Sequence, residues 1–171
     1  LPINDTTDKG DWDDSYPYRQ ASCFALHPIY VNLLAIKAKI PESLVKEIKE
    51  FSQQQEKQKT LDYPTVYAFK MEKLAQIYEY VKDNLNDDEN AKWLQSYAIY
   101  CFFRKKYGTS DFHSWPDHNE VTQKEIESDA DKYDKELNYT YWIQYECDRQ
   151  FHESYRYAED HKVALKGDLP I

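Results

Sequence analysis

One stretch of the chain repeats its apolar side chains at alternating intervals of four and three positions. The repeat consists of Tyr67, Met71, Leu74, Tyr78, Val81 and Leu85. Because an α-helix turns once in about 3.6 residues, side chains at this spacing line one face and pack at a shallow angle against another helix. The repeat is shorter than three heptads, which favours a seam inside one bundle over a free coiled coil. We therefore predict a helix over about residues 64–85.

Prolines indicate where two earlier helices begin. Pro28 and Pro41 suit the first turn of a helix, since the amide hydrogen that proline lacks would be unpaired there anyway. They predict a short helix over about residues 28–39 and a second helix over about residues 41–58.

A different pattern covers residues 89–107, where apolar side chains surround the helix instead of lining one stripe. This pattern predicts a central, largely buried helix. The acidic and amide residues at 86–89 predict its start, because such side chains cap helices and suit their N-terminal ends. Gly108 predicts its end.

The last helical pattern covers about residues 120–165. An unbroken helix there would be roughly 65 Å long, so we expect a break near Asn138. Apolar and polar side chains alternate over residues 139–147 as in a strand, but the sequence offers no comparable partner strand, and we predict a helix. Charges of alternating sign on this helix predict a solvated ladder of ion pairs. They belong to Glu146, Arg149, Glu153, Arg156 and Asp160.

The predicted fold class is all-α, a single-domain bundle of about five helices over residues 23–171. Residues 93–103 are expected at its centre, facing the seam. Residues 1–22 are rich in acids and broken by proline and glycine, which predicts an extended or disordered acidic arm. The chain has 3 glycines, too few for the glycine-rich phosphate loops of nucleotide-binding enzymes.

The net charge of −9 lies in two segments, with −3 in residues 1–20 and −6 in residues 111–136. A chain of this charge is a poor direct ligand for nucleic acid or anionic lipid, but it can bind a partner with a basic surface. The longest apolar run falls short of the roughly 20 residues that a membrane-spanning helix needs.

The three cysteines, Cys23, Cys101 and Cys147, are odd in number and form no Cys-x-x-Cys pair. This argues against a disulfide scaffold and a zinc site, and favours a reducing intracellular or organellar compartment over secretion. Two glycosylation sequons leave secretion open. Because the chain begins with Leu1 rather than Met, we expect that a preceding segment was removed, whether a signal peptide, a transit peptide or residues at a cloning boundary.

Two groups of side chains are candidates for metal or acid–base chemistry. The first consists of Asp111, His113, Asp117 and His118 in a loop, and the second of Asp148, His152 and Glu159 on the last helix. Imidazoles beside carboxylates can bind a divalent cation or exchange protons. The second group would need ligands from another helix, and the sequence lacks the Glu-x-x-His pairs typical of bundle metal sites. We therefore expect no metal and no cofactor.

Aromatic side chains in the arm and on the last helix are candidates for a partner interface. They are Trp12, Tyr16, Tyr18, Tyr141, Trp142 and Tyr145. Amphipathic rings are favoured anchors at interfaces, and no catalytic motif lies beside them. We predict a non-catalytic accessory or structural subunit that binds other protein chains, rather than an enzyme. Two alternatives stay open: an acidic protein that mimics DNA in a basic groove, and an enzyme that uses the loop 111–118.

Overall fold

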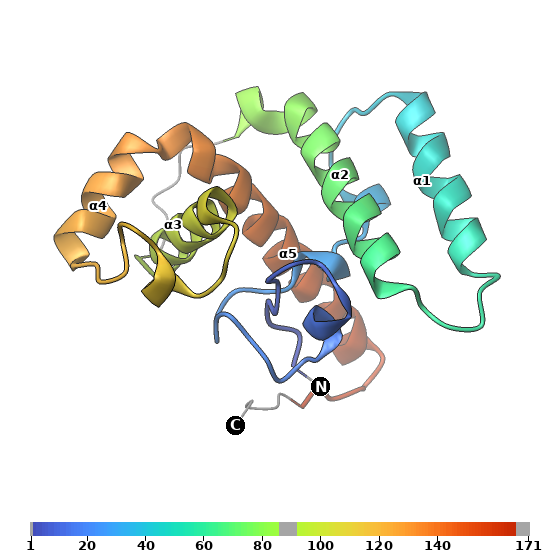
Figure 1. Ribbon diagram of the computed structural model, residues 1–171. Coiled ribbons are helices and arrows are strands. Elements are labelled where there is room, and N and C mark those ends of the chain that lie inside the picture. Colours follow the sequence, from blue (N-terminus) through green and yellow to red (C-terminus); the bar gives the residue numbers. More distant parts are fainter. Residues whose placement is uncertain (1, 86–91, 167–171) are drawn as a thin grey trace.

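Helices and short turns of helix form the regular structure of the described chain (Figure 1). The computed structural model describes residues 2–85 and 92–166. Its α-helices are α1 Glu42–Gln55, α2 Tyr63–Val81, α3 Lys92–Tyr107, α4 Gln123–Lys132 and α5 Asp134–Asp160. Its 3₁₀ turns are η1 Trp12–Ser15, η2 Pro28–Tyr30, η3 Leu33–Ala35, η4 Lys82–Asn84 and η5 Phe112–Ser114. The prediction of an all-α, single-domain fold is confirmed, with five α-helices in the described ranges.

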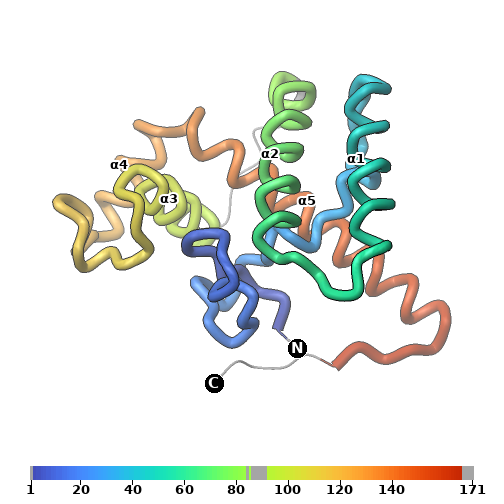
Figure 2. The backbone as a smooth tube through the Cα atoms, turned by 45° about the vertical axis from the view of Figure 1, so that its right-hand side comes forward, coloured from blue at the N-terminus to red at the C-terminus, as the bar shows by residue number. Residues whose placement is uncertain are grey.

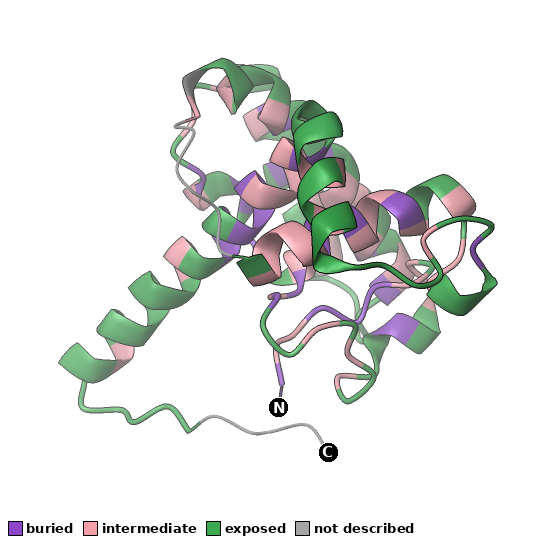
Figure 3. Ribbon diagram, turned by 90° about the vertical axis from the view of Figure 1, so that its left-hand side faces the viewer, coloured by how far each residue is buried: buried purple, intermediate pink, exposed green. Residues whose placement is uncertain are grey.

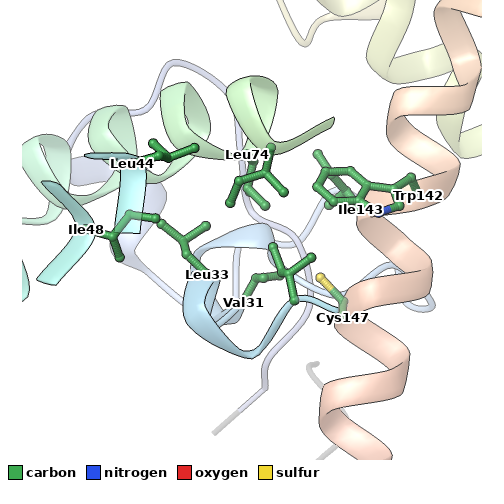
Figure 4. Close-up of a cluster of buried hydrophobic side chains, with 10 residues drawn as sticks. Val31, Leu33, Leu44, Ile48, Leu74, Trp142, Ile143 and Cys147 are labelled. Carbon is green, nitrogen blue, oxygen red and sulfur yellow. The ribbon is translucent and has the colours of Figure 1, made fainter. Parts of the chain in front are cut away.

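The first hydrophobic core lies where α1, α2 and α5 meet the turns η2 and η3. Figures 1 and 2 show α1 and α2 side by side, with α5 packed against α2. The buried side chains of this core, shown in Figure 4, are Val31, Leu33, Ile36, Leu44, Ile48, Leu74, Ile77, Trp142, Ile143 and Cys147. The predicted seam of α2 contributes Leu74 to it, with Met71, Tyr78 and Val81 partly buried beside it.

A second hydrophobic core joins α3 and α4 to the first turn of α5. Its buried side chains are Ala98, Ile99, Phe103, Trp115 and Leu137. Because α5 gives Leu137 to this core and Trp142 to the first, a single helix connects the two cores. The N-terminal half of α5 thus buries apolar surface in both cores, which stabilises the fold as one unit.

The predicted packing of residues 93–103 against the α2 seam is wrong. A cleft of about 1170 Å³ lies between α2 and α3, with Tyr67 and Tyr78 on one wall and Tyr97 and Cys101 on the other. The helix α3 packs instead on α4 and α5. A periodic pattern identifies the apolar face of a helix, but it does not identify the element that covers that face.

Residues 28–39 form the two turns η2 and η3, so the predicted short helix there is also wrong. The Nδ1 atom of His27 accepts the amide hydrogen of Ile29 at 3.1 Å, and Oδ1 of Asn32 accepts that of Leu34 at 3.1 Å. Side chains that bind the backbone two residues further along compete with a continued helix and favour turns.

The later helices follow the prediction with one shift of boundary. The helix α3 ends at Tyr107 as predicted, whereas its expected capping residues at 86–89 lie outside the described residues. The break between α4 and α5 falls at Tyr133 rather than at Asn138. Residues 139–147 are helical, which confirms the prediction for that stretch. From residue 151 onward α5 is largely exposed and projects from the body (Figure 3).

The N-terminal segment, predicted as an extended or disordered arm, packs on the helical body. It is tied to residues further along by backbone hydrogen bonds from Asp5 to the carbonyl oxygen of Ala25 and from His27 to that of Ile3, each 2.9 Å long. Four of its polar residues are buried: Asp5, Thr6, Thr7 and Asp14. Their side chains accept and donate internal hydrogen bonds instead of facing water, a difference that acidic composition does not reveal.

Within the described ranges, none of the helices combines the length and the apolar character that crossing a membrane would take. The thiols of Cys23, Cys101 and Cys147 are all free.

Candidate functional site

Buried, hydrogen-bonded aspartates organise a loop formed by residues 5–18, referred to below as the N-terminal loop. Its first support is Asp14, which is 2 % exposed. One oxygen of this side chain, Oδ2, accepts the backbone amide hydrogens of Asp8, Lys9 and Gly10 at 2.9, 3.0 and 2.6 Å. Successive amide groups of this kind form a concave binding site for an anion, and here the anion is a carboxylate of the same loop.

Gly10 lies where the N-terminal loop turns against α2. Its φ of +76° is a left-handed conformation that side-chain-bearing residues rarely adopt. A Cβ atom at this position would lie 2.7 Å from Cδ1 and Cε1 of Tyr67, so the backbone rests directly on that ring. The turn therefore requires glycine for both its conformation and its close approach to α2.

The second support is Asp5, which is 1 % exposed and connects the N-terminal loop to α3. Its carboxylate accepts the hydroxyl and the amide hydrogen of Thr7 at 2.6 and 3.0 Å, and the hydroxyl of Tyr97 at 2.7 Å. The guanidinium of Arg104 lies 3.7 Å from the same carboxylate and donates to the carbonyl oxygen of Thr7. Burial raises the pKa of Tyr97 well above its usual value, which keeps the phenol protonated as a donor.

Aromatic rings point outward from this supported loop. Trp12 is 58 % exposed, Tyr16 61 % and Tyr18 39 %, and the ring centroids of the two tyrosines are 5.7 Å apart. These three residues were predicted to face a partner, and the structure leaves them open to one.

The other predicted interface residues are more dispersed. Trp142 is 4 % exposed in the first core and therefore offers no surface to a partner. Tyr141 is partly buried against the second core, whereas Tyr145 is 64 % exposed on α5. The six aromatic residues do not form one patch, and the predicted partners, other protein chains with basic surfaces, stay a prediction.

The predicted histidine loop is held by local contacts. Oδ1 of Asp111 accepts the amide hydrogen of His113 at 3.2 Å and so caps η5. His118 Nε2 lies 2.9 Å from the carboxylate of Asp129 on α4, and its ring stacks on Phe103. The two imidazoles thus have separate surroundings.

Asp117, the remaining member of the loop group, is exposed. Neither candidate group forms a cluster of three or more metal-ligating side chains, and the rest of the described chain holds no such cluster either.

The second predicted group lies on the exposed end of α5. His152 Nδ1 is 2.9 Å from the carbonyl oxygen of Asp148 and 3.3 Å from its carboxylate, with both side chains more than half exposed. Glu159 is exposed about two turns beyond His152 and is the partner of Tyr155, whose pKa it raises. This is a helical surface with local pairs.

The predicted ladder of ion pairs is present at its beginning but is not solvated there. Arg149 lies 2.6 Å from Glu146 and 2.8 Å from Glu153, and it also donates to the carbonyl oxygen of Ala35 at 2.9 Å. The side chains of Glu146 and Arg149 are only 6 % and 13 % exposed. This part of the ladder therefore fixes α5 to the last residue of η3.

Residues 1–171 match the model of glycoside hydrolase family 77, described as 4-alpha-glucanotransferase. The chain belongs to this family of enzymes. No solved structure matches the chain.

Curated relatives agree with this assignment. The chain is 37 % identical over 182 residues to 4-alpha-glucanotransferase DPE2 of Oryza sativa subsp. japonica, covering all of this chain and 19 % of that protein. It is 29 % identical to 4-alpha-glucanotransferase of Chlamydia caviae and 27 % identical to that of Clostridium butyricum, covering all of this chain and 33 % and 35 % of those proteins. The chain therefore spans about a fifth to a third of the length of these relatives.

The family overturns the functional prediction. The interpretation as a non-catalytic accessory or structural subunit for complex assembly is wrong, as is the preference against an enzyme, because the family is one of glucanotransferases. The alternative of an acidic DNA mimic fails for the same reason.

No pattern in the sequence predicts the roles of Asp5, Gly10 and Asp14 in this loop. Gly10 could have indicated a structured turn, because it is one of 3 glycines in the chain and lies inside a run of acidic residues. A glycine between residues that can bind backbone amides is typical of a structured turn, whereas acidic composition alone favoured an arm.

Proposed function

We propose that the enzyme containing this chain is a 4-alpha-glucanotransferase, which moves a segment of an α-1,4-linked glucan to an acceptor, and that the N-terminal loop binds the glucan. One observation carries the proposal that the loop binds the glucan. The rings of Trp12, Tyr16 and Tyr18 are exposed, while the loop backbone is held by hydrogen bonds to the buried carboxylate of Asp14. The first part rests on the family and its curated relatives.

Exposed aromatic rings on a rigid loop suit a glucan for two reasons. The face of a sugar ring carries C–H groups that pack on the electron-rich face of an aromatic ring, while tyrosine and tryptophan also have a polar edge for sugar hydroxyls. A glucan is uncharged, so the net charge of −3 in residues 1–20 does not repel it. The same charge would disfavour an anionic ligand.

The two buried aspartates suit a structural part in this site and not the chemical step. Glycosidic chemistry generally uses one carboxyl group to protonate the leaving oxygen and a second on the opposite side of the sugar. Asp5 and Asp14 are each occupied by three hydrogen bonds from their own chain and are shielded from solvent. We therefore assign the N-terminal loop to substrate binding.

The proposal is tested by replacing Trp12 and Tyr16 with alanine, singly and together, in the enzyme that contains this chain. Glucose release from maltotriose and growth of longer products are then followed. Each single variant should raise KM about 5- to 30-fold, equivalent to roughly 1–2 kcal/mol of lost ring contact.

Tyr80→Ala is the matched control. Tyr80 is 50 % exposed in the last turn of α2, about 20 Å along the helix axis from Tyr67 and the N-terminal loop. Its KM should stay within about twofold of the parent value. Unchanged kinetics in the Trp12 and Tyr16 variants would refute the binding role of the loop, and absence of any transfer between glucans in the parent enzyme would refute the activity.

A further inference from the structure

We infer that Asp14 is a positioning residue for glucan binding: it fixes the N-terminal loop so that Trp12 and Tyr16 are held ready for the substrate without itself touching it. The inference rests on the proposed function of the loop. It adds a buried residue to the exposed rings of the loop.

The first step concerns position along the chain. Trp12 and Asp14 both belong to η1, and Tyr16 is its C-terminal cap residue, whose amide hydrogen binds the carbonyl oxygen of Asp13 at 3.4 Å. Asp14 thus lies between the two rings, two residues from each. Its side chain turns inward and is buried, while both rings turn outward and are more than half exposed.

The second step concerns how the loop is closed. The carboxylate of Asp14 accepts hydrogen bonds from three consecutive backbone amides in the first half of the loop, those of Asp8, Lys9 and Gly10. Its carbonyl oxygen accepts the hydroxyl of Thr6 at 2.5 Å. Asp14 therefore binds the first half of the loop through both its side chain and its backbone. The turn at Gly10 rests on the ring of Tyr67 of α2.

The order that Asp14 imposes on the loop should raise its affinity for glucan. A loop that is ordered before its ligand arrives loses less conformational entropy on binding, so preorganisation raises affinity without any added contact. Removal of the Asp14 carboxylate would leave the three amide groups without their acceptor and release residues 8–10 from η1. The effect on glucan should then be seen mainly in KM, because the rings are displaced but the reacting groups are not.

The variants Asp14→Ala and Asp14→Asn test this inference in the enzyme that contains the chain. Alanine removes the acceptor, whereas asparagine keeps one oxygen that can still accept the three amides. We expect Asp14→Ala to raise KM for maltotriose about tenfold with kcat changed less than about threefold, and Asp14→Asn to recover most of this loss. Amide hydrogen exchange in a peptide covering residues 8–14 should be faster in the alanine variant.

Asp62→Ala controls for general loss of stability. Asp62 caps α2 through Thr65, with its carboxylate 2.7 Å from the hydroxyl and 3.4 Å from the amide nitrogen, and it is exposed. Loss of this cap destabilises a helix without releasing the N-terminal loop, so KM should remain within about twofold of the parent value. An equal rise in KM for Asp62→Ala and Asp14→Ala would overturn the inference.

A combined variant separates positioning from direct contact. If Asp14 acts through the two rings, adding Asp14→Ala to Trp12→Ala/Tyr16→Ala should raise KM by less than about twofold more. Full additivity would overturn the inference. If Asp14→Ala does not fold, Thr6→Val takes its place, because it removes the hydrogen bond from the Thr6 hydroxyl to the carbonyl oxygen of Asp14. An unchanged KM in Thr6→Val would also overturn the inference.

The two failures remain distinguishable. Ring variants that leave KM unchanged would refute the proposed function, and the positioning inference with it. Ring variants that raise KM beside an Asp14→Ala enzyme with unchanged KM and unchanged exchange would refute the positioning inference alone.

Discussion

Tyr97 of α3 donates its hydroxyl hydrogen to the carboxylate of Asp5 across 2.7 Å, joining residues that are 92 positions apart in sequence. Both side chains are buried, at 7 % and 1 % exposure. A charge-assisted hydrogen bond in such surroundings holds the start of the N-terminal loop on the helical body.

The first prediction concerns this bond. Tyr97→Phe removes the donor and should lower the free energy of unfolding by about 1–3 kcal/mol, because the buried carboxylate loses a partner. Chemical denaturation measures the change. Tyr100→Phe is the control, since its half-buried hydroxyl forms a longer bond of 3.3 Å to the carbonyl oxygen of Ser110. Equal losses for the two variants would contradict the account.

The second prediction concerns pH and His27, which is 3 % exposed. Its Nδ1 atom accepts the amide hydrogen of Ile29, which leaves the hydrogen on Nε2 to be donated to the hydroxyl of Tyr63 at 2.8 Å. Burial lowers the pKa of His27 below its usual 6.5, while Asp5 and Asp14 act in the opposite direction more weakly.

The sign of the pH dependence follows from that shift. As pH falls below 6.5, the unfolded chain takes up a proton at this position before the folded chain does. The contribution of His27 to the free energy of unfolding should therefore be fully present above pH 6.5 and be lost progressively on acidification toward the lowered pKa. His27→Gln should reduce this dependence, measured by denaturation at a series of pH values, whereas His152→Gln at an exposed site should leave it unchanged. An identical pH profile in His27→Gln would argue against the assignment.

The third prediction compares two glycines of similar conformation. Gly10 and Gly108 have φ values of +76° and +71°, but an added Cβ would meet Tyr67 at Gly10 and has open space at Gly108. Gly108→Ala should lower the free energy of unfolding by about 1–2 kcal/mol, because alanine disfavours a left-handed backbone. Gly10→Ala should lower it by about 1–3 kcal/mol more, because the added Cβ also clashes with Tyr67. Thermal unfolding of both variants measures the difference. A Gly10→Ala enzyme as stable as Gly108→Ala would show that the loop does not rest on the ring as described.

The helices that could be predicted from sequence are those whose signals are local. The spacing from Tyr67 to Val81 specifies a helix, and α2 follows it, because period and propensity act within a few turns. The packing partner of that seam could not be predicted, since the position of α5 between the two cores depends on contacts across the whole chain.

The N-terminal loop shows the opposite case. Its acids resemble those of a solvated arm when only composition is considered, yet Asp5 and Asp14 are buried because they bind amides and hydroxyls brought to them by the fold. The residue types of Trp12, Tyr16 and Tyr18 made them candidates for contact with a partner, and the structure shows their rings exposed. Residue type alone does not distinguish a protein ligand from a sugar, because an aromatic ring suits either.

The central claim, that the N-terminal loop binds α-glucan, is tested most directly by hydroxyl-radical footprinting of the enzyme with and without maltoheptaose. We predict that the oxidation of Trp12, Tyr16 and Tyr18 decreases when the glucan is bound, while that of the exposed Tyr80 stays the same. A β-1,4-linked glucan of equal length should give no protection. Oxidation of all three rings that is unchanged at a saturating glucan concentration, in an enzyme that is transferring glucan, would contradict the claim.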